Sequence, residues 1–396
     1  YHSQMTQIAV AHAPLGYGGG ERVCFTVLEA LQDLYDVTLI TDRRPDITEY
    51  NAYYGTDVDT AQLDVQQMPR PVRLLFELFP GRPWKFKQLV VNRYLRTIES
   101  EFGLLVSTVN EYDLSTDSVQ YIHYPMYPRD GPDTPGNESL LYAVYDQLCS
   151  LVYTPSSDPL DNATLLTNSD WTASVIESAY GESARVVYPP VQTPDLDGLS
   201  WEERENGFVT IGRLAPEKRI LKLIDLVVAL TDRDHDLHYH IVGPRDNNEY
   251  ARQVERKADE HEYIHLEGKV STERLAELRA THRYGLHGME NEHFGIVVAE
   301  MATAGMIVFT HASGGQQEIL EDVDECLYSG WDDAVETIES VLNDRSQQVR
   351  IRKQLPGTAQ RFSEARFQRN VREAVSETLA QADNSSKSMV SSGTER

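Results

Sequence analysis

Short apolar runs alternate with amphipathic segments along this chain, and this alternation limits the folds open to it. The first series predicts a buried strand at 7–12, a helix at 22–34 and a strand at 37–41. Further strands are expected at 104–109 and 119–124. Because parallel strands need a crossover, usually helical, between them, alternation of this kind predicts an α/β fold with parallel sheets.

A second series begins after a break rich in proline and polar residues. The run Tyr188-Pro189-Pro190 and the polar stretch to Gly207 read as a linker. Strands are then expected at 208–212, 238–242, 264–266, 284–287 and 307–310, and helices at 171–179 before the linker and at 220–230, 248–258, 272–280 and 295–304 after it.

The length of 396 residues also favours two domains. We place the first at 5–190 and the second at 207–362. A helix at about 363–382 is expected to pack back on the first domain, and 383–396, rich in Ser, Asn and Thr, to be a disordered tail. Ligands are expected at the carboxyl ends of the strands and in a cleft between the domains.

Charge restricts the partners. The chain carries 62 acidic and 36 basic residues, a net charge of −26, which is the wrong sign for binding a nucleic-acid backbone. Of the basic residues 28 are Arg and 8 are Lys, and the acids are spread along the chain. This pattern is typical of a halophilic protein, because molar salt screens the repulsion between carboxylates; an acidic mesophilic protein is the alternative.

Other features bear on the compartment. Cys24, Cys149 and Cys326 lie far apart in sequence and form neither a metal motif nor an even disulfide framework, which fits a reducing cytoplasm. The sequence has no long apolar run and no signal peptide, so no transmembrane span is expected.

One segment departs from the acidic trend. Residues 70–96 carry seven basic side chains against the single Glu77, interleaved with aromatic and aliphatic residues. Such a stretch can lie on an anionic membrane, or it can be a helix packed on its own domain with a solvated basic face. We predict membrane contact by Arg73, Phe76, Phe79, Arg82, Trp84, Lys85, Phe86 and Lys87.

A glycine-rich loop precedes the first helix. The pattern Gly16-Tyr17-Gly18 would need Gly or Ala at position 21 to bind a dinucleotide, and that residue is Glu21. Nicotinamide chemistry is therefore disfavoured. Gly18, Gly19 and Gly20 can instead let an anion approach the helix N-terminus, or they can form a mere tight turn.

The second domain carries a stronger group of residues. Arg213 and Lys218 follow the strand that ends at Gly212, and two cations there can clamp a diphosphate. Glu292 and Glu300 stand eight apart around the start of a helix, where carboxylates can accept hydrogen bonds from sugar hydroxyls. The alternative is that these two cations are merely surface charges.

These residues carry a resemblance. Glu292 and Glu300, with His287 before them and 313–315 after them, resemble the signature of retaining GT-B glycosyltransferases of family four, and 212–218 resembles their diphosphate clamp. The strings at 18–23, 121–125, 187–190 and 291–296 are similar to those of the eukaryotic α-1,2-mannosyltransferases that extend the dolichol-linked oligosaccharide.

The resemblance implies a fold and roles. It implies two Rossmann-like domains whose parallel sheets face an interdomain cleft, the first binding acceptor and membrane and the second the nucleotide sugar. Catalytic roles fall to His123, Arg213, Lys218 and Glu292. The donor-binding set also includes Gly19, Gly20, Val270, Phe294, Gly295, Ile296 and Glu300, the last for the ribose.

The implied reaction moves a hexose, mannose from GDP-mannose, with retention of configuration and without metal or cofactor. The acceptor would be a polyprenyl- or dolichyl-linked glycan at the cytoplasmic face of the membrane, and the source a haloarchaeal relative of the family. Two alternatives stay open: a soluble enzyme that uses UDP-glucose or another nucleotide sugar with a small acceptor, and a non-catalytic GT-B binding protein.

Metal sites are the remaining alternative. The pairs Asp57/Asp59 and Asp232/Asp234 match the metal-binding carboxylates of another glycosyltransferase fold, although an acidic chain yields such pairs by chance. His238 and His240 can share a strand face and bind a metal, whereas solvated or core histidines are commoner. His293 and His311 are better placed as neighbours of a ligand than as metal ligands.

Overall fold

The chain folds into two α/β units in this computed structural model, 1–190 with 364–396, and 191–363. The structure describes residues 5–78, 84–126, 147, 149–153, 156, 158–191, 199–245 and 248–393, without the side chains of 78 and 385–393.

The first unit contains a parallel sheet of seven strands in the order β3-β2-β1-β4-β5-β6-β7. Its strands are β1 (Gln7–Ala11), β2 (Asp36–Thr41), β3 (Asp64–Gln67), β4 (Leu104–Ser107), β5 (Ser118–Ile122), β6 (Ala163–Thr167) and β7 (Arg185–Val186). Its helices are α1 (Gly19–Leu31), α2 (Ile47–Tyr54), α3 (Arg70–Leu78), α4 (Trp84–Ile98), α6 (Asp170–Tyr180) and α14 (Glu364–Gly393).

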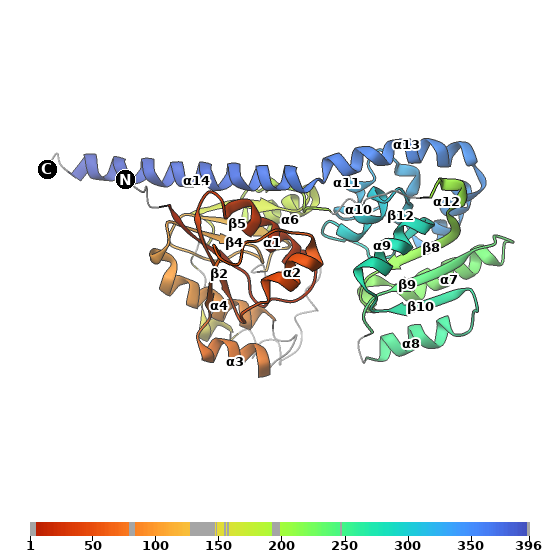
Figure 1. Cartoon of the computed structure of the whole chain (residues 1–396), viewed down its shortest axis with the longest axis horizontal. Coiled ribbons are helices and arrows are strands. Elements are labelled where there is room, and N and C mark those ends of the chain that lie inside the picture. The colour runs from red at the N-terminus through yellow and green to blue at the C-terminus, as the bar shows by residue number, and fades with distance from the viewer. Residues whose placement is uncertain are drawn as a thin grey trace. The chain divides into compact units, whose positions relative to one another are not determined.

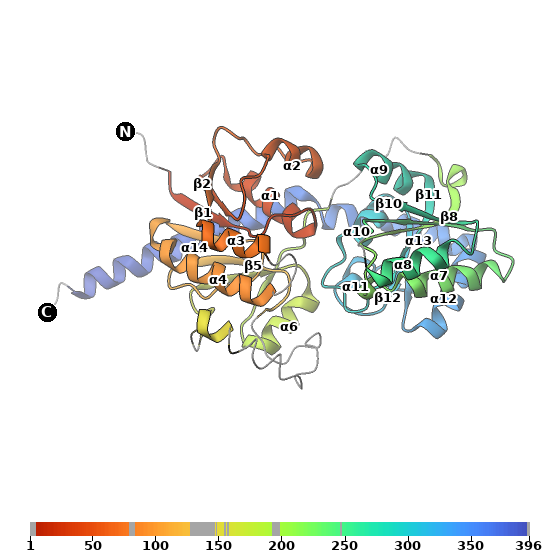
Figure 2. The same cartoon turned by 90° about the horizontal axis from the view of Figure 1, so that it is seen from below.

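The second unit contains a parallel sheet of six strands in the order β10-β9-β8-β11-β12-β13. The strands are β8 (Glu205–Ile211), β9 (His238–Val242), β10 (Ile264–Gly268), β11 (His282–His287), β12 (Ile307–His311) and β13 (Leu327–Tyr328). The helices are α7 (Ile220–Thr231), α8 (Glu249–Ala258), α9 (Thr272–Thr281), α10 (Ile296–Thr303), α11 (Gln316–Ile319), α12 (Trp331–Asn343) and α13 (Arg345–Arg361). Helices α7 and α8 lie side by side, as Figure 2 shows.

Both sheets place their first and fourth strands next to each other. In the first unit these are β1 and β4, and in the second β8 and β11. The order of strands reverses at this point, and open parallel α/β sheets bind ligands beyond the carboxyl ends of the strands at such a point. Each unit therefore has a natural ligand-binding position at that edge.

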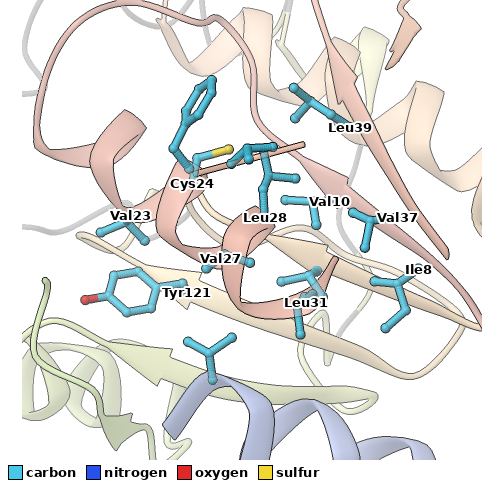
Figure 3. Close-up of a cluster of buried hydrophobic side chains, with 14 of the residues drawn as sticks. Ile8, Val10, Val23, Cys24, Val27, Leu28, Leu31, Val37, Leu39 and Tyr121 are labelled. Atoms are coloured by element: carbon cyan, nitrogen blue, oxygen red, sulfur yellow. The ribbon is translucent and has the colours of Figure 1, made fainter. Parts of the chain in front are cut away.

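The core of the first unit depends on helices from both ends of the chain. Side chains of α1 pack against β1 and β2, as the labelled Val27, Leu28 and Leu31 show in Figure 3. Helix α14 completes the same cluster with Phe367, Val371, Ala374 and Val375. Figure 1 shows α14 on one side of this sheet and α3 and α4 on the other.

Two helices, α1 and α14, differ by several residues from the ranges predicted from the sequence. Helix α1 begins at Gly19 and ends at Leu31, because Gly18 is the N-cap residue and Gln32 bonds the 57–59 loop with its side chain. Helix α14 continues to Gly393, so residues 383–393 are helical where a disordered tail was expected. No helix in the described residues is long and apolar enough to cross a membrane.

Removal of one α14 side chain tests this packing. Phe367 is 1% exposed, and Phe367→Ala is expected to destabilise the first unit by about 3–5 kcal/mol, through lost burial and the cavity left behind. Scanning calorimetry should show the transition of this unit at a lower temperature. Arg366→Ala, at an exposed position of the same helix, should leave it in place; equal effects of the two changes would contradict the role given to α14.

Candidate functional site

A lysine, a histidine and a glutamate meet at the carboxyl edge of the second sheet. Lys218 ends the 3₁₀ turn Pro216–Lys218 that follows β8, and His287 is the last residue of β11. Lys218 Nζ donates to Glu292 Oε2 at 2.6 Å, and His287 Nε2 lies 3.2 Å from the same oxygen. Both contacts use Oε2, which leaves Oε1 without a hydrogen bond from the described part of the chain.

The environment fixes the charge of this carboxylate. Burial raises the pKa of Glu292, but the hydrogen bond from His287 and the positive charge of Lys218 outweigh burial and bring the pKa well below its usual range. Burial and the nearby Lys218 lower the pKa of His287. Glu292 is therefore an ionised hydrogen-bond acceptor at neutral pH.

A second loop holds the backbone of Glu292. The amide of Gly315 donates to Glu292 O at 2.7 Å, and Asn291 N donates to Ser313 Oγ at 2.9 Å. Gly314 has φ +71°, and a Cβ there would lie 2.4 Å from Glu292 O. Only glycine fits this approach, which explains the Ser313-Gly314-Gly315 string beside the two glutamates.

The other predicted donor residues of this unit differ in exposure. Arg213 is exposed and its guanidinium donates to Glu217 at 3.2 Å. Gly295 is the N-cap of α10 and supplies no side-chain cap, so the amides of the first helical turn are available to an anion. Phe294 is buried beside Phe362, whereas Val270 and Ile296 are half-buried.

Glu300 lies in a different environment from the one the sequence suggested. It is on α10, 8% exposed, and its Oε2 accepts a 2.9 Å hydrogen bond from Arg279 of α9. Both side chains of this pair are buried. The expected ribose contact of Glu300 stays a prediction, and any hydroxyl would have to share the carboxylate with Arg279.

The first unit has its own polar group at the corresponding edge. His12 follows β1, and its Nδ1 lies 2.9 Å from Thr108 Oγ1 after β4. His12 Nε2 lies 3.8 Å from Glu21, whose carboxylate accepts from Gly16 N at 2.7 Å. His12 and Glu21 were not among the residues predicted from the sequence. The signals that could have found them are a histidine directly after a buried strand and an acidic residue directly after the glycine run.

The predicted residues of this unit lie beside that group. A Cβ at Gly20 would lie 3.5 Å from His123 Nε2 and 3.8 Å from His12 Cε1, so the glycine lets two imidazoles approach the start of α1. His123 Nε2 lies 3.1 Å from Thr108 O, and Gly19 is exposed. Contact of His123 with a hexose stays a prediction.

Part of the basic segment 70–96 is buried in the core of the first unit. Phe76 is 8% exposed and belongs to the cluster on the α3 and α4 side of the sheet, and Lys87 is 3% exposed with its ammonium 5.1 Å from the Phe76 ring centroid. The prediction that Phe76 and Lys87 contact a membrane is therefore wrong. Amphipathic helices bury one face, and these two side chains lie on the buried one. Trp84 is 40% exposed, Arg73, Lys85 and Phe86 are half-buried, and Phe79 and Arg82 lie outside the described residues.

Among the residues that the sequence offered as metal ligands, His238 and His240 lie close together in the described part of the chain. His282, which the sequence did not indicate, lies beside them. No such group of three or more possible ligands includes the carboxylate pairs of the sequence reading, Asp57/Asp59 and Asp232/Asp234, within the described ranges.

Known proteins resemble this chain in sequence. Residues 192–356 match the family model described as glycosyl transferases group 1. A Dictyostelium discoideum protein named GDP-Man:Man(3)GlcNAc(2)-PP-Dol alpha-1,2-mannosyltransferase is 27% identical over 253 residues, which cover 56% of this chain and 50% of that protein. The human protein of the same name is 23% identical over 414 aligned positions, which cover 89% of this chain and 82% of that protein. The alignment thus spans half the length of the Dictyostelium relative.

Solved structures resemble it in fold. Anabaena Alr3699/HepE in complex with UDP and glucose has a TM-score of 0.67 and 15% identity, covering 94% of this chain and all of that one. WaaG, a glycosyltransferase involved in lipopolysaccharide biosynthesis, has a TM-score of 0.65 and 14% identity. The match covers 89% of this chain and 95% of WaaG. At this identity the likeness concerns the fold alone, and it confirms the fold class expected from the sequence.

The buried pair between α9 and α10 gives a test of the site's framework. Arg279→Met removes the cation and leaves Glu300 buried without it, which is expected to destabilise the second unit by about 3–5 kcal/mol in denaturant titration. Arg274→Met, at a more exposed position of α9, should cost at most about 1 kcal/mol. If both changes lowered the free energy of unfolding equally, the buried Arg279–Glu300 pair would stabilise the unit no more than a surface pair does.

Proposed function

We propose that this chain, whose residues 192–356 match the family model of glycosyl transferases group 1, transfers mannose from GDP-mannose to a lipid-linked oligosaccharide. The donor and acceptor are those in the names of the similar Dictyostelium and human proteins. The observation that carries the proposal is the meeting of Lys218, His287 and Glu292 at the carboxyl edge of the sheet in the second unit.

The site suits a nucleoside diphosphate sugar. Lys218 and the exposed Arg213, both after β8, would bind the diphosphate together with the amides at the start of α10. The ionised Glu292 would accept hydrogen bonds from the hexose hydroxyls through Oε1. Lys218 is bound to Glu292, so the group that neutralises the leaving phosphate also positions the carboxylate that holds the sugar.

The proposed transfer retains configuration. The bond between the anomeric carbon and the phosphate oxygen breaks, and the acceptor hydroxyl attacks on the same face. Its proton passes to the leaving phosphate oxygen, so GDP leaves with the proton. Fixed cations stabilise the charge that develops on the diphosphate more in the transition state than in the ground state.

A donor panel tests the reaction and its metal independence. The full chain, assayed in molar salt with a short-chain lipid-linked oligosaccharide, is expected to use GDP-mannose and to keep its rate within about twofold after brief treatment with EDTA. Preference for UDP-glucose would overturn the donor assignment and favour the alternative soluble enzyme. Loss of activity in EDTA and recovery with Mn²⁺ would overturn metal independence.

A single substitution tests the diphosphate clamp. Lys218→Ala removes a charge-assisted contact of about 1.5–3 kcal/mol, so the affinity for GDP should fall about ten- to a hundredfold in calorimetry. Lys222→Ala, an exposed lysine at the start of α7, is the matched control and should bind GDP like the parent. If both variants bind equally well, Lys218 belongs to the framework and not to the ligand.

We infer further that the first unit docks on the cytoplasmic face of an anionic membrane through α3 and the start of α4. The exposed Arg70 and Leu74 are one turn apart on α3, and Trp84 opens α4. Arginine would bind lipid phosphates while the leucine and tryptophan enter the interface. In molar salt the apolar side chains would carry most of the attachment, since screening weakens the ionic part.

Liposome flotation with anionic vesicles in high salt tests the docking surface. The double variant Leu74→Ser and Trp84→Ser is expected to lose co-flotation. A matched control, Leu34→Ser and Tyr53→Ser, changes exposed apolar side chains elsewhere in the same unit and should float like the parent. Unchanged flotation of the first variant would end the membrane proposal and leave the transfer reaction untouched.

A further inference from the structure

Three histidines converge at the amino edge of the sheet in the second unit. His238 is the first residue of β9 and His282 the first of β11, and His240 lies two residues along β9 on the same face as His238. One ring nitrogen from each lies within 4.8 Å of the others. Lys218, His287 and Glu292 gather at the carboxyl edge, so this cluster has no part in that site.

A glycine makes the convergence possible. β8 lies between β9 and β11, so the two histidine-bearing strands are about 10 Å apart. Gly207 of β8 is paired with His238, and a Cβ at Gly207 would lie 2.3 Å from His238 Nε2. The imidazole of His238 occupies the space over the glycine, which brings its ring centroid within 5.0 Å of that of His282.

Hydrogen bonds fix which nitrogens carry lone pairs. His240 Nδ1 lies 2.7 Å from Glu267 Oε1, and His282 Nδ1 lies 3.0 Å from Leu278 O. A carboxylate and a carbonyl can only accept, so each Nδ1 holds the proton and each Nε2 a lone pair. Pairing of an imidazole N–H with a carboxylate or carbonyl is the usual second-shell arrangement of metal-bound histidine.

Two ring nitrogens of the cluster have no hydrogen bond. Nε2 of His282, on a side chain 2% exposed, and Nε2 of His238 are both buried without a hydrogen bond. Glu205 Oε2 lies 3.3 Å from His238 Nε2 and 4.0 Å from His282 Nε2. Buried unsatisfied nitrogens beside a carboxylate are costly in a site with no ligand, and they are what a cation would satisfy.

We propose that His238, His240 and His282, with Glu205 as a fourth ligand, bind a divalent transition metal of the zinc class. Three imidazole nitrogens and one carboxylate oxygen are a donor set that Zn²⁺ accepts in tetrahedral geometry. Zinc–nitrogen bonds of about 2.0 Å place neighbouring donors about 3.3 Å apart, so the rings need to close by about 1–1.5 Å. The metal would tie β9 to β11 across β8 and so stabilise the second unit.

Calorimetric titration of the chelator-treated full chain with ZnCl₂ tests the proposal. We expect one zinc per chain and a rise in the melting temperature with added zinc. His238→Gln and Glu205→Gln, both at accessible side chains, are each expected to weaken zinc binding at least tenfold. His261→Gln is the matched control, since this histidine lies in the same unit outside the cluster.

Visible absorption of Co²⁺ in place of zinc gives a second measurement, because its spectrum distinguishes four-coordinate from six-coordinate geometry. Mannosyl transfer by His238→Gln should match that of the parent, which separates this site from the proposed reaction. Failure of the parent to bind zinc, or equal zinc affinity of His238→Gln and His261→Gln, would overturn the proposal and leave the cluster as packed neutral imidazoles.

Discussion

One ionised carboxylate organises the second unit. Glu292 is largely buried, and it keeps its charge because Lys218 and His287 contact the same oxygen. An isolated charge at such a position would be costly, so the three side chains are energetically linked. They come from the turn after β8, the end of β11 and the segment before α10, and their contacts fix these three segments together.

The order of the first six strands is the same in the two units, and this order explains where polar groups gather. At the point where the order reverses, the carboxyl ends of β1 and β4 lie next to each other in one unit, and those of β8 and β11 in the other. His12 and Thr108 meet there in the first unit, and Lys218, His287 and Glu292 in the second. The amino edge of the second sheet holds a separate histidine cluster, made possible by one glycine of β8.

The sequence predicted much of the secondary structure and little of the side-chain environment. Strands β8 and β9 and helices α7 and α10 lie within a few residues of their expected positions, since apolar periodicity reports directly on which face is buried. The periodicity of 70–96 was compatible with both a membrane face and a core face. Phe76 and Lys87 turned inward because the sheet behind them needed covering, a need that local sequence does not express.

The sequence by itself determined the α/β class, the two series of elements and the residue types near the site, because strand and helix periods and glycine positions are local properties. Only the tertiary structure decided which charges meet. Lys218 and Glu292 are 74 residues apart and Arg279 and Glu300 are 21 apart, and neither pairing follows from spacing along the chain. Likewise His238 and His282 become neighbours only because the sheet places β8, with Gly207, between their strands. Contacts of this kind depend on strand order and register, which the packing of the whole unit sets.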